Sequence, residues 1–154
     1  MKQPLNIFWF RRDLRLDDNV GFYNALRSDC PVLPIFIFDS DLLDKLPKDD
    51  ARVTFIFETL QKMRDSLQNE HRSGIAMYHG KPIDVYKQLL DQYDIKSVYT
   101  NHDYEPYAKE RDSEIEELLS THNIEFKTYK DQVIFEKDEV VKKDGTPYMV
   151  YTPY

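Results

Sequence analysis

The chain has 154 residues and a formal net charge of −7 at pH 7, a length that suits one domain with a single core. The acidic balance excludes a protein that holds nucleic acid through a generally basic surface, because phosphate contacts need clustered Lys and Arg. Cys30 is the only cysteine, and no apolar stretch reaches the length of a membrane span or of a signal-peptide core. We therefore expect a soluble, cytoplasmic protein with no membrane partner.

Short apolar runs alternate with segments that have helical spacing of apolar residues. The apolar runs predict strands over residues 5–10, 32–38, 75–79, 97–101 and 124–129. The segments between them predict helices over residues 20–27, 51–70, 82–93 and 106–122, with a connecting loop at 42–50. In the longest predicted helix one apolar stripe should face the sheet, formed by Ile56, Leu60, Met63 and Leu67.

This alternation predicts an α/β fold of the Rossmann-like, doubly wound type. Five parallel strands should form one sheet, with right-handed crossovers that place helices on both faces. The alternation stops near residue 131, and residues 132–154 should form an extended tail with a turn at Asp144 and Gly145. We accordingly divide the chain into an α/β domain, residues 1–131, and a tail, residues 132–154.

The sequence lacks the motifs that are typical of most kinds of catalysis. The chain contains no GxGxxG, no GxxxxGK[ST] and no GxSxG, and it has only four glycines. The four histidines are scattered without ligand spacing, so no metal site is predicted. Asp103 and Glu105 could act as paired carboxylates, although such residues more often cap the helix that follows. No catalytic residue is predicted.

Charged residues follow the predicted strands where a parallel sheet binds ligands. The first strand ends in Arg11, Arg12 and Asp13, and the second ends in Asp39. The crevice beyond the carboxyl ends of the strands is the usual binding site in open α/β sheets. A solvated loop with internal ion pairs is the alternative reading of the same residues. The 14% of aromatic residues fits either a large aromatic core or a flat ligand stacked among rings.

Three motifs resemble the amino-terminal α/β domain of the DNA photolyase and cryptochrome family. They are FWFRRDLRLDDN at 8–19, YTNHDYEPYAKERD at 99–112 and KDGTPYMVYTPY at 143–154. The resemblance implies a domain that holds a light-harvesting antenna chromophore. It also implies a second, helical domain beyond Tyr154, which binds FAD and flipped-out pyrimidine dimers in DNA. We therefore expect the chain to be the first part of a deoxyribodipyrimidine photolyase, a carbon–carbon lyase, and to be inactive by itself.

The resemblance and the strand ends together predict the cofactor-binding residues. These are Phe10, Arg11, Arg12, Phe36, Phe38, Asp39, Arg52, Asn101, Asp103, Glu105 and Tyr107. In deazaflavin-binding members, residues that match Arg52 and Asp103 touch the chromophore. Members with the best-known folate pocket carry Asn-Glu where this chain has Tyr107 and Ala108. The chromophore is left open among 8-hydroxy-deazaflavin, FMN, FAD and methenyltetrahydrofolate.

Other interpretations remain open from the sequence. Arg52 could pair only with a surface acid, and Asp103 could only cap the next helix. The parent protein could be a cryptochrome-type blue-light photoreceptor, which would use the same module for signalling. An unrelated nucleotide-binding α/β protein is the third possibility.

Overall fold

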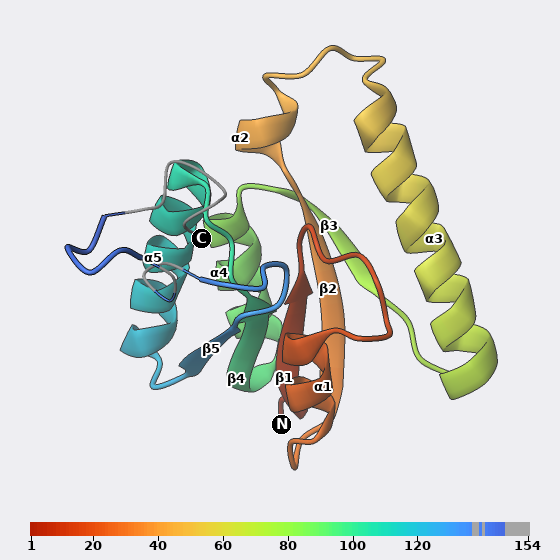
Figure 1. The fold of residues 1–154 in the computed structure, drawn as a ribbon. Coiled ribbons are helices and arrows are strands. Elements are labelled where there is room, and N and C mark those ends of the chain that lie inside the picture. Colours follow the sequence, from red (N-terminus) through yellow and green to blue (C-terminus); the bar gives the residue numbers. More distant parts are fainter. Residues whose placement is uncertain (137–138, 140, 147–154) are drawn as a thin grey trace.

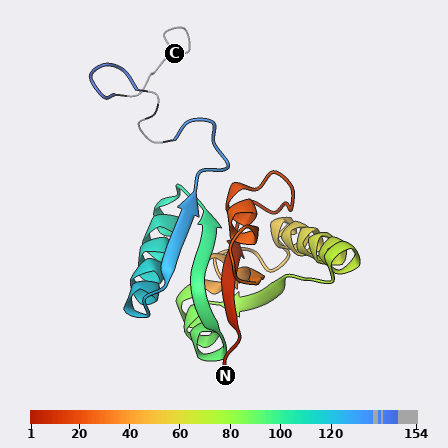
Figure 2. The same cartoon turned by 90° about the horizontal axis from the view of Figure 1, so that it is seen from below.

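The structure is a computed structural model that describes residues 1–136, 139 and 141–146. In this part of the chain, five strands form one sheet in the order β3-β2-β1-β4-β5, and each neighbouring pair is parallel (Figures 1 and 2). The strands are β1 (Pro4–Phe10), β2 (Val32–Asp39), β3 (Ala76–Gly80), β4 (Asp94–Asn101) and β5 (Glu125–Tyr129). The strand order reverses between β1 and β4, which confirms the predicted doubly wound sheet.

Helices cover both faces of the sheet, as predicted. They are α1 (Val20–Leu26), α2 (Ser40–Leu43), α3 (Ala51–His71), α4 (Pro82–Gln92) and α5 (Pro106–Thr121). Buried side chains of α4 and α5 pack in one core cluster, and those of α1 and α3 pack in a second. Among the described residues, no helix is both long and apolar enough to cross a membrane.

The central strand β1 contributes to both core clusters because its side chains alternate between the two faces. Ile7 and Trp9 belong to the cluster with α4 and α5, whereas Phe8 and Phe10 belong to the cluster with α1 and α3. All four side chains are almost fully buried. The continuous apolar run in the sequence therefore reflects a strand that is covered on both faces.

Strand β4 begins three residues earlier than predicted. Asp94 pairs with Pro4, and Ile95 pairs with Leu5, so the ladder to β1 extends past the predicted start at Ser97. Asp94 and Lys96 form an exposed salt bridge of 2.7 Å. The polar side chains of Asp94 and Lys96 interrupt the apolar pattern that predicts a strand. Pairing with a neighbouring strand leaves no local pattern in the sequence.

The segment after β2 also differs from the prediction. The predicted loop at 42–50 overlaps a short helix, α2, which starts directly at the end of the strand. The carboxylate of Asp39 caps this helix by accepting a hydrogen bond of 3.0 Å from the backbone N–H of Asp41. The chain therefore turns away from the sheet edge at Asp39.

The predicted stripe of α3 divides into two parts. Leu60, Met63 and Leu67 are buried against the sheet. Ile56, one turn earlier, is only partly buried, because the first turns of α3 extend past the carboxyl edge of the sheet (Figure 1). This projecting part of α3 forms one side of the cavity described below.

The described part of the tail contains a turn and neither helix nor strand. The backbone N–H of Gly145 donates to the carbonyl of Lys142 at 2.9 Å, and Gly145 has φ 80°, a conformation that favours glycine. The turn predicted at Asp144 and Gly145 is therefore present. Residues 137–138, 140 and 147–154 of the predicted tail lie outside the described residues, and the domain boundary at residue 131 stays a prediction.

The buried stripe of α3 should dominate the stability of the domain. Leu60 is fully buried, so Leu60→Ala should lower the free energy of unfolding by about 3 kcal/mol through lost transfer energy and a new cavity. The matched control is Leu26→Ala, because Leu26 is 58% exposed on α1 and its truncation should cost less than about 1 kcal/mol. Urea unfolding followed by circular dichroism would measure both. A broad transition without cooperativity in the wild type would contradict independent folding of the chain.

Candidate functional site

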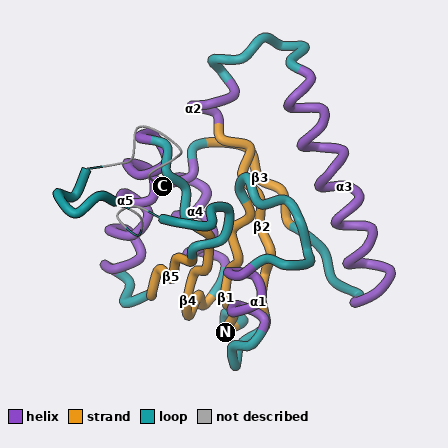
Figure 3. The backbone as a smooth tube through the Cα atoms, viewed as in Figure 1, coloured by secondary structure: helices purple, strands orange, loops and turns teal. Residues whose placement is uncertain are grey.

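A cavity of about 470 Å³ is lined by residues at the carboxyl ends of β1 and β2 and in the segment that joins α2 to α3. Figure 3 traces the backbone of these elements. The size of the cavity is within the range of roughly 300–1,000 Å³ that is usual for small-molecule sites. Of the predicted residues, those that line it are Phe10, Arg11, Arg12, Phe36, Phe38, Asp39, Arg52 and Asp103. The sequence analysis had not selected the remaining lining residues, which are Trp9, Ile37, Leu42, Leu43, Lys45, Leu46, Val53, Ile56 and Arg111.

The inner wall of the cavity is aromatic. Phe36 and Phe38 project from the same face of β2, because they are two residues apart, and their rings meet edge to face at 4.9 Å. Phe10, at the end of the neighbouring strand β1, pairs in register with Phe36. The strand pairing therefore gathers phenylalanines from two strands beside one space.

The outer wall is aliphatic and comes from outside the sheet. The projecting first turns of α3 contribute Val53 and Ile56. The region of α2 contributes Leu42, Leu43 and Leu46. A flat ring between these walls would meet phenylalanine on one side and branched aliphatic side chains on the other, an arrangement suited to an apolar ligand face.

Two buried arginines stand at the inner end of the cavity. The side chains of Arg11 and Arg111 are only 7% and 8% exposed. Asp112 binds both: Arg11 Nη1 donates to its Oδ2 at 2.6 Å, and Arg111 Nη2 donates to its Oδ1 at 3.1 Å. Arg111 also lies 3.7 Å from Asp103, whose side chain is 8% exposed. An unpaired buried charge is strongly destabilising, so the ion pairs among these four side chains must all be formed in the folded domain.

The sequence also indicates a role for Arg111, through its position within the apolar stripe of a helix. On α5 it is spaced with Ala108, Ile115 and Leu119 at helical intervals, and all four are buried. A charged residue within the apolar stripe of a helix has to find a partner inside the protein. That pattern indicates Arg111 as a candidate site residue from this one sequence, with no comparison to related proteins.

Tyr107 supports the site from behind the cavity wall. Its hydroxyl donates a hydrogen bond of 2.7 Å to Oδ2 of Asp39, which lines the cavity. Burial, and then the hydrogen bond to Asp39, raise the pKa of Tyr107 above its ordinary value. The phenol therefore stays protonated and holds the carboxylate of Asp39 in place, while its ring lies outside the lining of the cavity.

Arg52 and Asp103 both line the cavity but in different settings. The side chain of Arg52 is 71% exposed at the rim and pairs with Asp50, the N-cap residue of α3, through Nη2 at 2.6 Å. Asp103 is buried beside Arg111, and it also accepts a long hydrogen bond of 3.4 Å from the backbone N–H of Glu105. The local pairing of Arg52 with an acid is thus present, whereas Asp103 does not cap α5, whose N-cap residue is Glu105.

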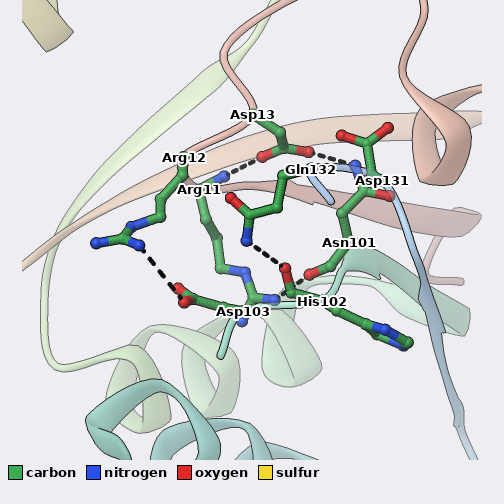
Figure 4. A pocket seen from close by; sticks show the side chains of 8 residues that line it. All are labelled: Arg11, Arg12, Asp13, Asn101, His102, Asp103, Asp131 and Gln132. Atoms are coloured by element: carbon green, nitrogen blue, oxygen red, sulfur yellow. Dashed lines mark hydrogen bonds and ion pairs between the residues drawn. The ribbon is translucent and has the colours of Figure 1, made fainter. Parts of the chain in front are cut away.

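Asn101 does not line this cavity and lies in a polar network between β1 and β4 (Figure 4). Its Nδ2 donates to Asp13 Oδ2 at 2.6 Å and to Asn19 Oδ1 at 2.8 Å, and its Oδ1 accepts from the backbone N–H of Gly21 at 2.9 Å. A Cβ atom at position 21 would lie 2.6 Å from that oxygen, so the approach of α1 requires glycine there. The network leaves only about 10 Å³ of space at this crevice, about the volume that one water needs.

Glu105 lies outside the cavity as well. It is exposed, and it forms an ion pair of 3.5 Å with Arg12, whose side chain is 59% exposed. Exposed pairs of this kind contribute little to stability. Among the described residues, no group of three or more His, Cys, Asp or Glu side chains is arranged to hold a metal ion.

The fold is that of a doubly wound α/β domain, and the cavity with aromatic walls and paired buried ions is its candidate ligand site. A family model described as DNA photolyase matches residues 6–154, and the chain belongs to the DNA photolyase family. A deoxyribodipyrimidine photo-lyase of Synechococcus sp. is 32% identical over 100% of the chain and 31% of its own length. Cryptochrome-1 of Drosophila melanogaster is 28% identical over 91% of the chain and 27% of its own length.

Solved structures of the family have the same fold. A class III photolyase from Agrobacterium tumefaciens superposes with a TM-score of 0.84 and 25% identity, covering 99% of this chain and 31% of its own. An archaeal photolyase from Sulfolobus tokodaii, described as having two FAD molecules with the implication of a novel light-harvesting cofactor, gives a TM-score of 0.78 and 32% identity over 90% of this chain and 32% of its own. The chain thus spans about a third of the length of these photolyases.

The Asn101 network should be essential for stability. Asn101→Ala would remove one of the donors to the buried carboxylate of Asp13 and the acceptor of the Gly21 N–H, and should lower the free energy of unfolding by about 3 kcal/mol. Asn24→Ala is the control, because the Asn24 amide makes only an exposed hydrogen bond within α1 and should cost less than about 1 kcal/mol. Denaturant titration would compare them. Equal effects would contradict a structural role of Asn101.

The rim pair should be visible in an acid titration. The hydrogen bonds of Arg52 lower the pKa of Asp50 from 3.8 to about 2. The pair therefore stabilises the folded state above pH 3.8, and this contribution is lost as the pH falls through about 2. In Arg52→Ala the pKa of Asp50 should return toward its ordinary value, which carboxyl carbon NMR would measure. An unchanged pKa in the variant would show that the pair does not form in solution.

Proposed function

We propose that this chain is the light-harvesting, chromophore-binding domain of a photolyase-family protein. The observation that carries the proposal is the cavity of about 470 Å³, walled by Phe10, Phe36 and Phe38 and bordered by buried Arg and Asp side chains. A light-harvesting ligand needs rigid placement and no acid, base or nucleophile from the protein. The paired ions and aromatic rings of this cavity suit placement of a flat ring.

The ligand we propose is a conjugated ring from the set 8-hydroxy-deazaflavin, FMN, FAD and methenyltetrahydrofolate. Asp103 is suited to accept a hydrogen bond from a ring N–H or hydroxyl, and Arg52 to contact a polar edge at the rim. The Sulfolobus photolyase supports a flavin, because it is described with two FAD molecules that imply a novel light-harvesting cofactor.

For the whole protein we propose light-driven splitting of pyrimidine dimers, which is the activity of a deoxyribodipyrimidine photo-lyase. The relatives are about three times as long as this chain, which supports a second domain that would hold FAD and damaged DNA. By itself the 154-residue chain should split no dimers. A cytoplasmic location is part of this proposal and suits a chain with one cysteine.

A blue-light photoreceptor of the cryptochrome type is the second candidate. The match to Drosophila cryptochrome-1 over 91% of the chain favours it, since that protein shares this domain. Both candidates use the same cavity for the same ligand class. They differ in the chemistry that the rest of the parent protein would supply.

Trp9 offers a direct binding assay, because it lines the cavity and is the only tryptophan in the chain. Titration with FMN, FAD, 8-hydroxy-deazaflavin and methenyltetrahydrofolate should quench its emission saturably for at least one ligand. Asp103→Ala should weaken that binding about tenfold or more, because a buried partner is lost. Arg52→Ala should weaken it only a few-fold, because Arg52 is largely exposed.

Lys48→Ala is the matched control for charge, since Lys48 is exposed on the same segment and does not line the cavity. Its affinity should equal that of the wild type. A ligand that binds the wild type and both site variants equally well would show that Arg52 and Asp103 are not the site. Failure of all four ligands to bind would overturn the chromophore-binding proposal.

A further inference from the structure

Trp9 occupies an unusual electrostatic position in the wall of the cavity. It is 2% exposed and lines the cavity, and guanidinium carbons of Arg11 and Arg111 lie 5.0 Å and 4.9 Å from the centre of its ring. Both arginines are buried, so water screens their charges poorly. Two positive charges so close to one indole make removal of an electron from that indole less favourable.

The other aromatic groups that line the cavity or pack against Trp9 are also difficult to oxidise. Three of the lining rings are phenylalanines, which have no ionisable group and no lone pair on the ring. Tyr86 lies edge to face against Trp9 at 5.4 Å, but its fully buried hydroxyl has no hydrogen-bond partner among the described residues. A tyrosine gives up an electron readily only when its proton has an acceptor. Tyr107, whose hydroxyl has Asp39 as an acceptor, lies outside the lining.

We propose that the cavity wall protects an excited chromophore from quenching by electron transfer, and that Arg11 and Arg111 do so by making Trp9 resistant to oxidation. In the suppressed step, one electron would leave the Trp9 indole and enter the excited ring. The products would be an indole radical cation and a chromophore reduced by one electron, with no bond or proton exchanged. Both arginines disfavour the cation that this step creates.

The carboxylates of Asp103 and Asp112 oppose this effect. The proposal therefore predicts opposite shifts in the oxidation of Trp9 when a carboxylate or a guanidinium is removed. Asp103 and Asp112 are bound to the same guanidinium groups and offset part of their field at the ring. Removal of the negative charge of Asp103 should therefore make Trp9 harder to oxidise. Removal of the positive charge of Arg111 should make it easier.

The purpose of this arrangement rests on the proposed chromophore-binding function, because only a light-harvesting ligand has an excited state to preserve. The redox property of Trp9 belongs to the chain itself. It can be measured without any ligand, so the two proposals can fail separately.

The first experiment uses the ligand-free chain and pulse radiolysis, with the Trp9 radical equilibrated against a soluble reference couple. Arg111→Met should shift that equilibrium toward the oxidised indole by about tenfold or more, while Arg111→Lys, which keeps the charge, should stay near the wild type. Asp103→Asn should shift it in the opposite direction. If Arg111→Met does not fold, Asp103→Asn still decides, and the absence of a shift in it would overturn the proposal.

The second experiment measures the fluorescence lifetime of bound FMN. The lifetime should shorten several-fold in Arg111→Met and recover in the double variant Trp9→Phe with Arg111→Met, because the electron donor is then gone. A several-fold longer lifetime in Trp9→Phe alone would show that Trp9 quenches in the wild type, which contradicts the proposal. If FMN does not bind, the proposed ligand class fails, and the ligand-free measurement decides on the role of the arginines.

Discussion

The guanidinium of Arg11 joins three elements at the carboxyl edge of the sheet. It extends from the end of β1, donates to the backbone carbonyl of Asn101 at the end of β4, and binds Asp112 on α5. A buried guanidinium without these partners would cost several kcal/mol, so the ends of β1 and β4 and the first turns of α5 have to assemble in one arrangement. The geometry of the whole edge depends on this one side chain and its acceptors.

The candidate binding site lies away from the place where the fold would suggest it. In open α/β sheets the crevice at the point of strand-order reversal usually takes the ligand. Here that crevice, between β1 and β4, is filled by Asp13, Asn19 and Asn101, whose hydrogen bonds also hold α1 against the sheet. The space for a ligand lies instead at the β1 and β2 side. It exists because α3 extends past the sheet edge and α2 turns away at Asp39.

The chemistry of the cavity is that of a holding site. Two of its carboxylates have fixed partners, because Asp39 accepts a hydrogen bond from the Tyr107 hydroxyl and Asp103 pairs with Arg111, so their orientations are set before any ligand arrives. Fixed dipoles and ions orient a polar ring edge without reorganising, whereas aromatic and aliphatic walls hold its faces.

The sequence alone determined the fold class, the five strands, the family and eight of the seventeen residues that line the cavity, because these depend on local periodicity and on motifs at strand ends. Tertiary structure decided what local patterns do not encode. Pairing with β1 extended β4 to Asp94. Long-range hydrogen bonds place the Asn101 side chain in the structural network and not in the cavity lining. Trp9 and Arg111 line the cavity because the contacts of Asp112 bring α5 against the end of β1. Each of these outcomes depends on contacts between residues far apart in the chain, whose energies no single segment carries.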